Sequence, residues 1–423
     1  MKCDLIIQNA AQLLTCASDD KPKRGLQMRE LSIIKNGALA VDKGKIIAVG
    51  DSRIVQSDFQ SLDVIDAANK IVAPAFVDCH THIVFAGNRL DEFELKLRGA
   101  DYLEILANGG GILSTVEATR NATALELSEQ SRKRLDSMLR NGTTTAEVKT
   151  GYGLAEYAEI KMLDAIAEID QTHAVDLIPT FLAAHAVPPE YKNNVDEYVK
   201  MVCEKWLPLA MNWFKDSHFP IETTPFFCDV FCEKNAFDLS QSRRILETAK
   251  GLGYKLKAHV DEFTNLGGTR MAIELGATSV DHLDEISTDE IALLSKSDTI
   301  AVVMPTVNFN FGSSKFADAR RLIDENCAVA VSTDYNPGSA PCPSLPMAMA
   351  VACRYQKLLP SEAFNAATIN AAFATGLGDT IGSLEVGKFA DIAIFDTDDY
   401  RQIAHEFGAN FVSTVIKHGR TAF

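Results

Sequence analysis

Two histidines separated by one residue offer the clearest chemistry in the sequence. His80 and His82 end an apolar run that begins at Ile71. In a strand, residues i and i+2 point to the same face, so the two imidazoles would project side by side from the carboxyl end of a buried strand. Two neutral imidazoles suit zinc or iron. They could also be polar residues that cap a strand as it leaves the core, so further ligands have to come from elsewhere.

The ends of other predicted strands supply candidates for those ligands. His259 follows Lys255-Leu-Lys-Ala, and Asp334 follows the apolar run 327–333. Asp334 could also simply begin the turn Asp-Tyr-Asn-Pro-Gly338. Three nitrogens and one oxygen would leave a coordination position for water, as in catalytic metal sites. The predicted metal ligands are therefore His80, His82, His259 and Asp334.

A second metal ion would need a bridging ligand, such as a carbamylated lysine at the end of the fourth strand. That strand ends in Cys232-Glu-Lys-Asn, and Lys234 is in poor register for the role. The sequence therefore favours one divalent or trivalent ion, zinc or iron. Such an ion would lower the pKa of a bound water toward ~7 and polarise a carbonyl.

Three more side chains near strand ends could act in proton transfer. Glu262 lies three residues past His259 and could carry a proton, although a solvated loop carboxylate would look the same in the sequence. His282 could hydrogen-bond the water or a developing oxyanion, or be a satisfied polar residue at a barrel rim. His185, which follows Phe181-Leu-Ala-Ala, could donate to a substrate carbonyl.

Two residues could recognise a substrate. Arg89 lies seven residues after His82, and its planar guanidinium suits a carboxylate. A surface salt bridge is equally compatible with its position. The segment Gly151-Tyr152-Gly153 would place a flexible loop and a phenol over the same region, or form a simple turn.

The elements that must position these residues alternate between strands and helices. Amphipathic patterns predict helices such as 124–140 and 156–170 between apolar strands. Eight such units over ~300 residues predict a closed (β/α)8 barrel, with its chemistry at the carboxyl ends of the strands. The predicted strands span 71–79, 143–149, 174–183, 226–232, 254–260, 278–282, 299–305 and 328–333.

The two ends of the chain differ from this pattern, because they contain short strands and tight turns. We expect a small β-sandwich domain from residues 1–70 plus 383–423, beside a metal-dependent barrel hydrolase domain of 71–382. Two long connections interrupt the barrel: 85–120, which contains Gly109-Gly-Gly111, and 187–223, which contains both tryptophans. Long connections at the carboxyl ends of barrel strands usually build the active site.

Composition narrows the class of partner. The chain has 423 residues, 47% of them hydrophobic, and a formal net charge of −16, which argues against nucleic acid or an anionic membrane as a partner. Nine scattered cysteines, several within apolar runs, indicate reduced thiols and a cytoplasmic protein. No apolar run reaches ~18 residues, so no membrane span is expected. The first nine residues lack the long apolar core of a signal peptide.

Taken together, these motifs resemble the amidohydrolase superfamily, and most closely the imidazolonepropionase family, along almost the whole chain. The resemblance implies hydrolysis of 4-imidazolone-5-propanoate at its cyclic amide bond, which gives N-formimidoyl-L-glutamate in histidine degradation. It also implies a mononuclear zinc or iron site at the four ligands above and a homodimer. The segments that carry it are 76–89, 108–115, 142–153, 181–188, 258–263, 281–283 and 332–339.

The resemblance further implies which residues contact the substrate, a small molecule that bears a carboxylate. In this interpretation Asp334 or His282 accepts a proton from water, His185 holds the carbonyl oxygen, and Glu262 relays a proton to the leaving nitrogen. Arg89, with help from Tyr152, holds the propionate. The full set of implied contacts is Arg89, Tyr152, His185, Glu262, Asn336, Gly338 and Ser339.

Two other functions stay open at this level. One is another cyclic-amide hydrolase or a deaminase on the same barrel; Arg89 and the loop 334–339 count against it. The other is a catalytically inactive scaffold that binds partners through the barrel. A scaffold of that kind should have lost metal ligands, and all four are present here.

Overall fold

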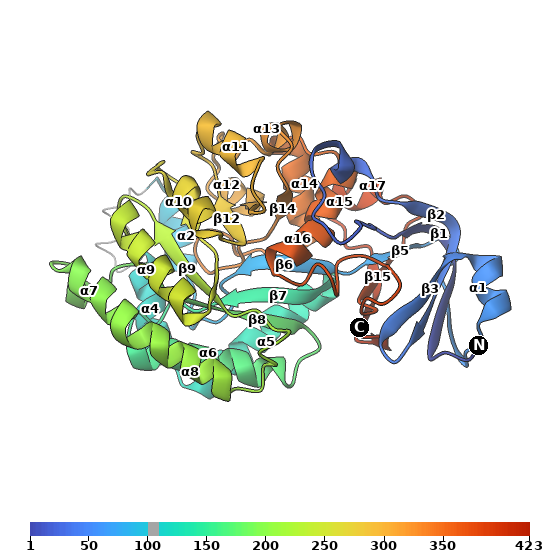
Figure 1. The fold of residues 1–423 in the computed structure, drawn as a ribbon, viewed down its shortest axis with the longest axis horizontal. Coiled ribbons are helices and arrows are strands. Elements are labelled where there is room, and N and C mark those ends of the chain that lie inside the picture. The colour runs from blue at the N-terminus through green and yellow to red at the C-terminus, as the bar shows by residue number, and fades with distance from the viewer. Residues whose placement is uncertain (100–109) are drawn as a thin grey trace.

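Two sheets organise the chain (Figure 1). The structure is a computed structural model, and it describes residues 1–99 and 110–423. Gly109, with the other residues of 100–109, lies outside the described residues. One sheet forms a barrel, and the other is built from both ends of the chain and lies beside it. The predicted combination of a (β/α)8 barrel with a small β domain from the termini is confirmed.

Eight parallel strands form the barrel in sequence order, and each predicted strand has a counterpart. The first and last strands meet where Thr81 pairs with Tyr335 and the His82 amide donates to the Tyr335 carbonyl at 2.9 Å. The fifth strand is split into two short pieces. The strands are β6 (Phe76–Thr81), β7 (Thr143–Lys149), β8 (Asp176–Ala184), β9 (Phe227–Cys232), β10 (Lys255–Leu256) with β11 (His259–Val260), β12 (Ser279–His282), β13 (Ile300–Val303) and β14 (Val329–Val331).

Helices cover the outside of the barrel (Figure 1). The predicted helices 124–140 and 156–170 are confirmed as α5 (Ala124–Arg140) and α6 (Glu156–Asp170). A capping box between Thr123 and Glu126 fixes the start of α5. The other barrel helices are α9 (Leu239–Leu252), α10 (Gly268–Leu275), α11 (Thr288–Leu294), α12 (Pro305–Asn310), α13 (Ala319–Asp324), α14 (Leu345–Tyr355), α15 (Pro360–Ala366) and α16 (Ile369–Ala374).

The predicted strand 71–79 is two strands in different sheets. β5 (Ile71–Pro74) pairs with β1 and β15 of the terminal sheet, whereas β6 belongs to the barrel. The domain division at residues 70 and 383 stays a prediction. The rest of the terminal region is β1 (Leu5–Leu14), β2 (Ile33–Asp42), β3 (Lys45–Asp51), α1 (Ser52–Asp58), β4 (Asp63–Asp66), β15 (Ile392–Phe395), α17 (Arg401–His405), β16 (Val412–Lys417) and β17 (Arg420–Thr421).

The two long connections contain helices. The long connection 187–223 is largely helical, because α7 (Val195–Met201), a π-helical turn (Val202–Trp206) and α8 (Leu207–Asp216) form one helical stretch. It packs beside α9 on the outside of the barrel. Trp206 is buried there. In the 85–120 connection, α2 (Leu90–Leu97) and α4 (Ile112–Asn121) flank the undescribed residues.

The sequence predicts free thiols and no membrane span, and the structure bears on both. All nine cysteines have unpaired thiols. Within the described ranges, no helix has the length and apolar character that a membrane crossing requires.

Lys417 joins the terminal sheet to the amino end of the barrel. Its ammonium lies 2.7 Å from a carboxylate oxygen of Asp391, before β15, and 2.7 Å from one of Asp176, the first residue of β8. Only 7% of the lysine side chain is exposed. Burial alone would lower the pKa of Lys417, but Asp391 and Asp176 raise it. Asp176, Asp391 and His418 are close enough to suggest a cation site, but the lysine ammonium already lies between the two carboxylates.

We predict that Lys417→Met lowers the free energy of unfolding by about 3 kcal/mol, because the substitution leaves the Asp391 carboxylate buried without its partner. Urea unfolding followed by circular dichroism measures the change. Because the folded-state pKa of Lys417 is raised, its contribution is complete below the ordinary lysine pKa and is lost only as pH rises through the folded value.

The matched control is Lys70→Met. Lys70 pairs with Asp396 at 3.7 Å in an exposed ion pair, so its loss should change stability by less than about 0.5 kcal/mol. Equal effects of the two substitutions would contradict the role of Lys417.

Candidate metal centre and active site

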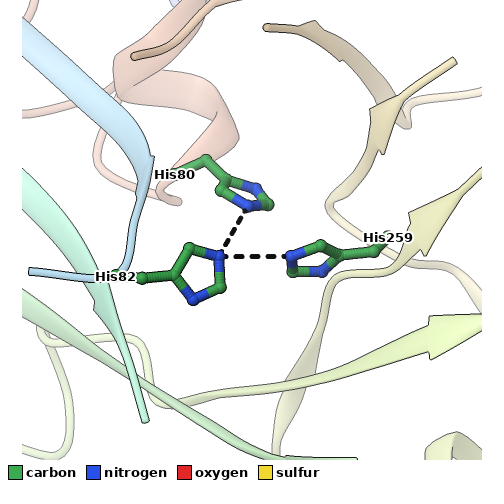
Figure 2. Close-up of side chains that lie close together, drawn as sticks. All are labelled: His80, His82 and His259. Carbon is green, nitrogen blue, oxygen red and sulfur yellow. Dashed lines mark hydrogen bonds between the residues drawn. The ribbon is translucent and has the colours of Figure 1, made fainter. Parts of the chain in front are cut away.

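Three histidine side chains meet at the carboxyl ends of the barrel strands (Figure 2). His80 lies in β6, His82 directly follows it, and His259 begins β11. Nε2 of His82 lies 3.3 Å from Nε2 of His80 and 3.4 Å from Nε2 of His259. All three side chains are buried. The structure therefore brings together the three histidines that the sequence places at strand ends.

Carboxylates lie on the far side of two rings. His80 Nδ1 donates to Asp281 Oδ2 at 2.6 Å, which fixes its proton, whereas His259 Nδ1 lies 2.9 Å from Asp229 Oδ2 without the geometry of a hydrogen bond. A neutral imidazole with its proton on Nδ1 presents a lone pair at Nε2. Burial, then the nearby Lys149 ammonium and the other imidazoles, hold the pKa of His80 well below its ordinary value. The Nε2 lone pair of His80 therefore faces His82, and so does Nε2 of His259.

Imidazole nitrogens that point at one another with no proton between them are suited to bind a metal cation. Asp334 adds an oxygen, because its Oδ1 lies 3.4 Å from His82 Nε2 and 3.6 Å from His80 Nε2. Within the described part of the chain, that oxygen and Nδ1 of His82 have no hydrogen-bond partner. Burial raises the pKa of Asp334, a cost that a bound cation would offset. A donor set of three nitrogens and one oxygen suits zinc or iron.

Lys149 forms part of a layer of buried charges beneath the histidines. Its ammonium contacts Glu147 and Asp229 at 2.8 Å each, and all three side chains are fully buried. Burial would raise the pKa of Asp229, but His259 and Lys149 hold it well below the ordinary range. Asp229 is therefore an anion that can orient the His259 ring.

Lys257 plays a similar part on the other side of the layer. Its ammonium donates to the Ser279 hydroxyl at 2.7 Å, and that hydroxyl donates to Asp281 Oδ1 at 2.6 Å. The chain of contacts continues to His80 through Asp281. Both rings with a carboxylate beside Nδ1 are thus supported by a carboxylate and a lysine from other parts of the barrel sheet.

These supporting residues were missed in the sequence, although a signal was present. Glu147 and Lys149 stand two residues apart in one buried strand, as do Lys257 and His259 in another. Residues two apart share a face, and buried charges need partners. Charged side chains at alternate positions of apolar barrel strands therefore indicate a polar layer inside the barrel.

Two residues at the carboxyl ends of the sixth and eighth barrel strands have left-handed backbones. Asp334 has φ of 50° and His282 has φ of 87°. Such conformations in non-glycine residues cost of order 1–3 kcal/mol and occur at functional sites. Asn336 stabilises the turn after Asp334, because its side chain donates to the Asp334 carbonyl at 2.7 Å and accepts from the Ser339 amide at 2.7 Å.

His185 and Tyr152 line one side of the centre. The His185 ring stacks on His82 with centroids 4.8 Å apart, and the Tyr152 ring lies 5.4 Å from it. His185 Nδ1 lies 3.1 Å from the Gly151 carbonyl, which can only accept a hydrogen bond. Gly151 has φ of 103°, and a Cβ there would lie 2.9 Å from that same nitrogen. Burial lowers the pKa of His185 to about 3, so the ring is neutral with its proton on Nδ1.

Glu262 and His282 face each other across another side. His282 Nδ1 lies 3.8 Å from Glu262 Oε1, whose side chain is only 11% exposed. Burial, then the charge of Asp334, raises the pKa of Glu262 well above its ordinary value, which favours the protonated acid. Lys234, the weak candidate for a bridging ligand, is exposed.

Arg89 lies next to the loop that follows β14. Its side chain is 11% exposed, and a Cβ built on Gly338 would lie 2.8 Å from one of its terminal nitrogens. The predicted contact residues Asn336, Gly338 and Ser339 thus belong to one loop that also carries Asp334. The sequence left Arg89 undecided between a carboxylate contact and a surface salt bridge. Arg89 pairs with Glu92, and both side chains are largely covered, so this ion pair does not lie on the open surface.

Known proteins resemble the chain over nearly its full length. A family model described as Amidohydrolase family matches residues 240–422. An imidazolonepropionase from Chloroflexus aggregans is 52% identical over 99% of this chain and 98% of its own length. Imidazolonepropionases from Herpetosiphon aurantiacus and Alkaliphilus oremlandii are 48% and 44% identical, again over 99% of this chain, and over 96% and 98% of their own lengths.

Solved structures share the fold. An adenosine deaminase from Xanthomonas campestris with bound zinc superposes with a TM-score of 0.73 at 19% identity and covers 99% of this chain and 93% of its own. Guanine deaminase from E. coli superposes with a TM-score of 0.70 at 17% identity, over 99% and 98%. At these identities the likeness supports the barrel architecture alone.

We predict that Asp281→Asn weakens metal binding about 10–100-fold, because an amide no longer requires the proton on His80 Nδ1. Competition with a chromogenic chelator measures the affinity without any need for turnover. The matched control is Asp170→Asn, which alters another aspartate–histidine pair, to His218 at 2.7 Å, far from the centre. Metal affinity of Asp281→Asn within about twofold of the unaltered protein would contradict the prediction.

Proposed function

This chain belongs to the imidazolonepropionase family, and from that premise we propose how its site hydrolyses 4-imidazolone-5-propanoate to N-formimidoyl-L-glutamate. The chain is a hydrolase of the amidohydrolase superfamily, and its reaction is a step of histidine degradation. Water adds to the ring carbonyl carbon, the cyclic carbon–nitrogen bond breaks, and the ring nitrogen gains a proton. The observation that carries the proposal is the convergence of His80, His82, His259 and Asp334, with the half-buried Arg89 next to the loop that carries Asp334.

His80, His82, His259 and Asp334 would hold a single metal ion. When bound, the ion supplies Lewis acidity that activates water and polarises the ring carbonyl. The donor set suits both zinc and iron, and metal analysis of the purified protein decides between them. The same measurement addresses the scaffold alternative, which requires a protein that neither holds nor responds to metal.

Asp334 or His282 would accept the proton that water loses. Both lie at strand ends beside the three histidines, and the His282 and His80 ring centroids are 5.5 Å apart. Their left-handed backbones turn both side chains into the site where the strands end. A base at either position would take the proton directly from a water held among the three histidines.

Glu262 would deliver a proton to the leaving ring nitrogen. A buried carboxyl that retains its proton is an effective acid for a nitrogen that becomes basic as its bond to carbon breaks. Its contact with His282 at 3.8 Å gives a short route from the residue that takes the proton to the residue that returns it.

His185 would contact the substrate in a different way from the one expected. Because its Nδ1 proton is directed to the Gly151 carbonyl, Nε2 of the neutral ring can accept but cannot donate a hydrogen bond. We therefore assign it to a ring N–H of the substrate instead of the carbonyl oxygen. Stacking on His82 keeps the ring beside the metal ligands.

Arg89 would bind the propionate, with Tyr152 beside it. The guanidinium presents paired donors that match a carboxylate. Asn336, Gly338 and Ser339 would complete the subsite from the loop after β14. We also propose that the protein is a homodimer, which the family resemblance implies. We place it in the cytoplasm because its cysteines indicate a reducing compartment.

We predict that the purified, metal-loaded protein hydrolyses 4-imidazolone-5-propanoate and prefers it over hydantoins and nucleobases by roughly 10²-fold or more in kcat/KM, because those compounds leave Arg89 without a carboxylate. Loss of the substrate's absorbance follows the reaction. Faster turnover of a nucleobase would favour the deaminase alternative.

We predict that Glu262→Gln lowers kcat by about 10²–10⁴-fold while metal content is unchanged, since an amide cannot supply the proton. Steady-state kinetics with parallel metal analysis measure both quantities. Glu285→Gln is the control, because Glu285 lies on a nearby loop but pairs with Lys315. Turnover near the unaltered level with metal retained would remove Glu262 from the relay.

A further inference from the structure

Glu92 is the sole buried residue of α2. Its side chain is 5% exposed, whereas Phe93 and Leu97 on the same helix are 50% and 72% exposed. A surface helix normally buries its apolar side chains and exposes its carboxylates. This reversal indicates that α2 is oriented so that Glu92 can make polar contacts, and not so that its apolar side chains can pack.

The carboxylate of Glu92 holds three donors. Oε2 accepts from the Arg89 guanidinium and from the Gly111 amide, the latter at 2.8 Å, and Oε1 is 2.7 Å from the Lys96 ammonium. Among the described residues, Glu92 is the one carboxylate within ion-pair distance of Arg89. Burial would raise the pKa of Glu92, but these donors lower it to about 2. The group is therefore an anion throughout the physiological range.

Two sides of the Arg89 guanidinium are fixed. Glu92 bonds Nε and a terminal nitrogen, and the Gly338 backbone lies against the group from the loop that also carries Asp334. A Cβ at Gly338 would approach Cζ of Arg89 to 3.0 Å, so any other residue there would push the guanidinium away from its present position. An arginine held in this way has already lost the rotamer freedom that binding a carboxylate would otherwise cost.

Charge balance supports the same role. Glu92 cancels one of the two positive charges of Arg89 and Lys96, and the group as a whole keeps a charge of about +1. A single propionate carboxylate matches that charge. Without Glu92 the two cations would repel each other and turn toward solvent.

We propose that Glu92 is a positioning residue for substrate selection, which orients the Arg89 guanidinium toward the carboxylate of the substrate and so sets KM for carboxylate-bearing substrates. This inference rests on the proposed function, because it takes the propionate as the group that Arg89 binds. It places selectivity on a residue that touches neither the substrate nor the metal ligands.

The test compares Glu92→Gln with Glu94→Gln. Glu94 lies on the same helix and pairs with Arg98, but both side chains are more than half exposed. We expect Glu92→Gln to raise KM for 4-imidazolone-5-propanoate about tenfold with kcat within about twofold, and Glu94→Gln to change neither. On the propionamide analogue, which carries no charge, the Glu92 variant should equal the unaltered protein.

Two further variants make the result decisive. With Arg89→Met already present, Glu92→Gln should add less than about twofold to KM, because it acts through the arginine. Glu92→Asp keeps the charge but shortens the side chain, so it should also raise KM with kcat kept, which tests the idea even if Glu92→Gln does not fold.

Several outcomes would overturn the proposal. A KM that is unchanged or lower in Glu92→Gln would show that removing its negative charge matters more than orientation. Equal losses in kcat, or equal losses on the uncharged analogue, would indicate a merely structural role. Failure of the proposed function is separate, because the unaltered protein would then not hydrolyse 4-imidazolone-5-propanoate at all.

Discussion

The buried hydrogen bond between His80 and Asp281 is the interaction on which the rest of the site depends. It spans 2.6 Å between β6 and β12, on strands that are not neighbours in the barrel sheet. Inside a barrel an unpaired carboxylate would be very costly, so Asp281 requires the Nδ1 proton of His80 and the Ser279 hydroxyl. That requirement directs the Nε2 lone pair of His80 to the place where the other ligands meet.

Closure of the barrel is the second constraint. Asp78 in β6 accepts hydrogen bonds from the Ser332 and Thr333 hydroxyls and from the Thr333 amide. These contacts hold the first strand against the segment that follows β14, and the Ser332 hydroxyl also donates to the His80 carbonyl at 2.9 Å. Asp334 therefore reaches the histidines because the chain closes at this seam. The same carboxylate at the end of an open sheet would be too far away.

Much of this arrangement follows from the sequence, because periodicity and strand ends carry it. The helices 124–140 and 156–170 were found because their apolar residues recur at helical spacing and cluster on one face. The division of 71–79 could not be found, since both halves are buried and nothing in an apolar run marks a change of sheet. The helical stretch 195–216 was missed because two tryptophans and a proline obscure its periodicity. Asp229, Asp281 and Lys149 were missed for another reason: the contacts Lys149–Asp229, Asp229–His259 and Asp281–His80 join different strands, and only the folded barrel brings these residues together.

One connection, from β6 to α2, links the chemistry to the choice of substrate. His82 and Arg89 are separated by a short segment that α5 clamps, because Arg134 donates to the Ile83 and Phe85 carbonyls at 2.8 and 2.9 Å and covers the Phe85 ring at 3.4 Å. If His82 holds the metal ion and Arg89 the substrate carboxylate, as proposed, this backbone would set the distance between them. A substrate must then place its scissile carbonyl and its carboxylate at the same separation. Within the described residues, no hydrogen bond or ion pair joins the charged layer beneath the histidines to residues 83–98. A change of side chain in this connection would therefore leave the support of the three histidines intact.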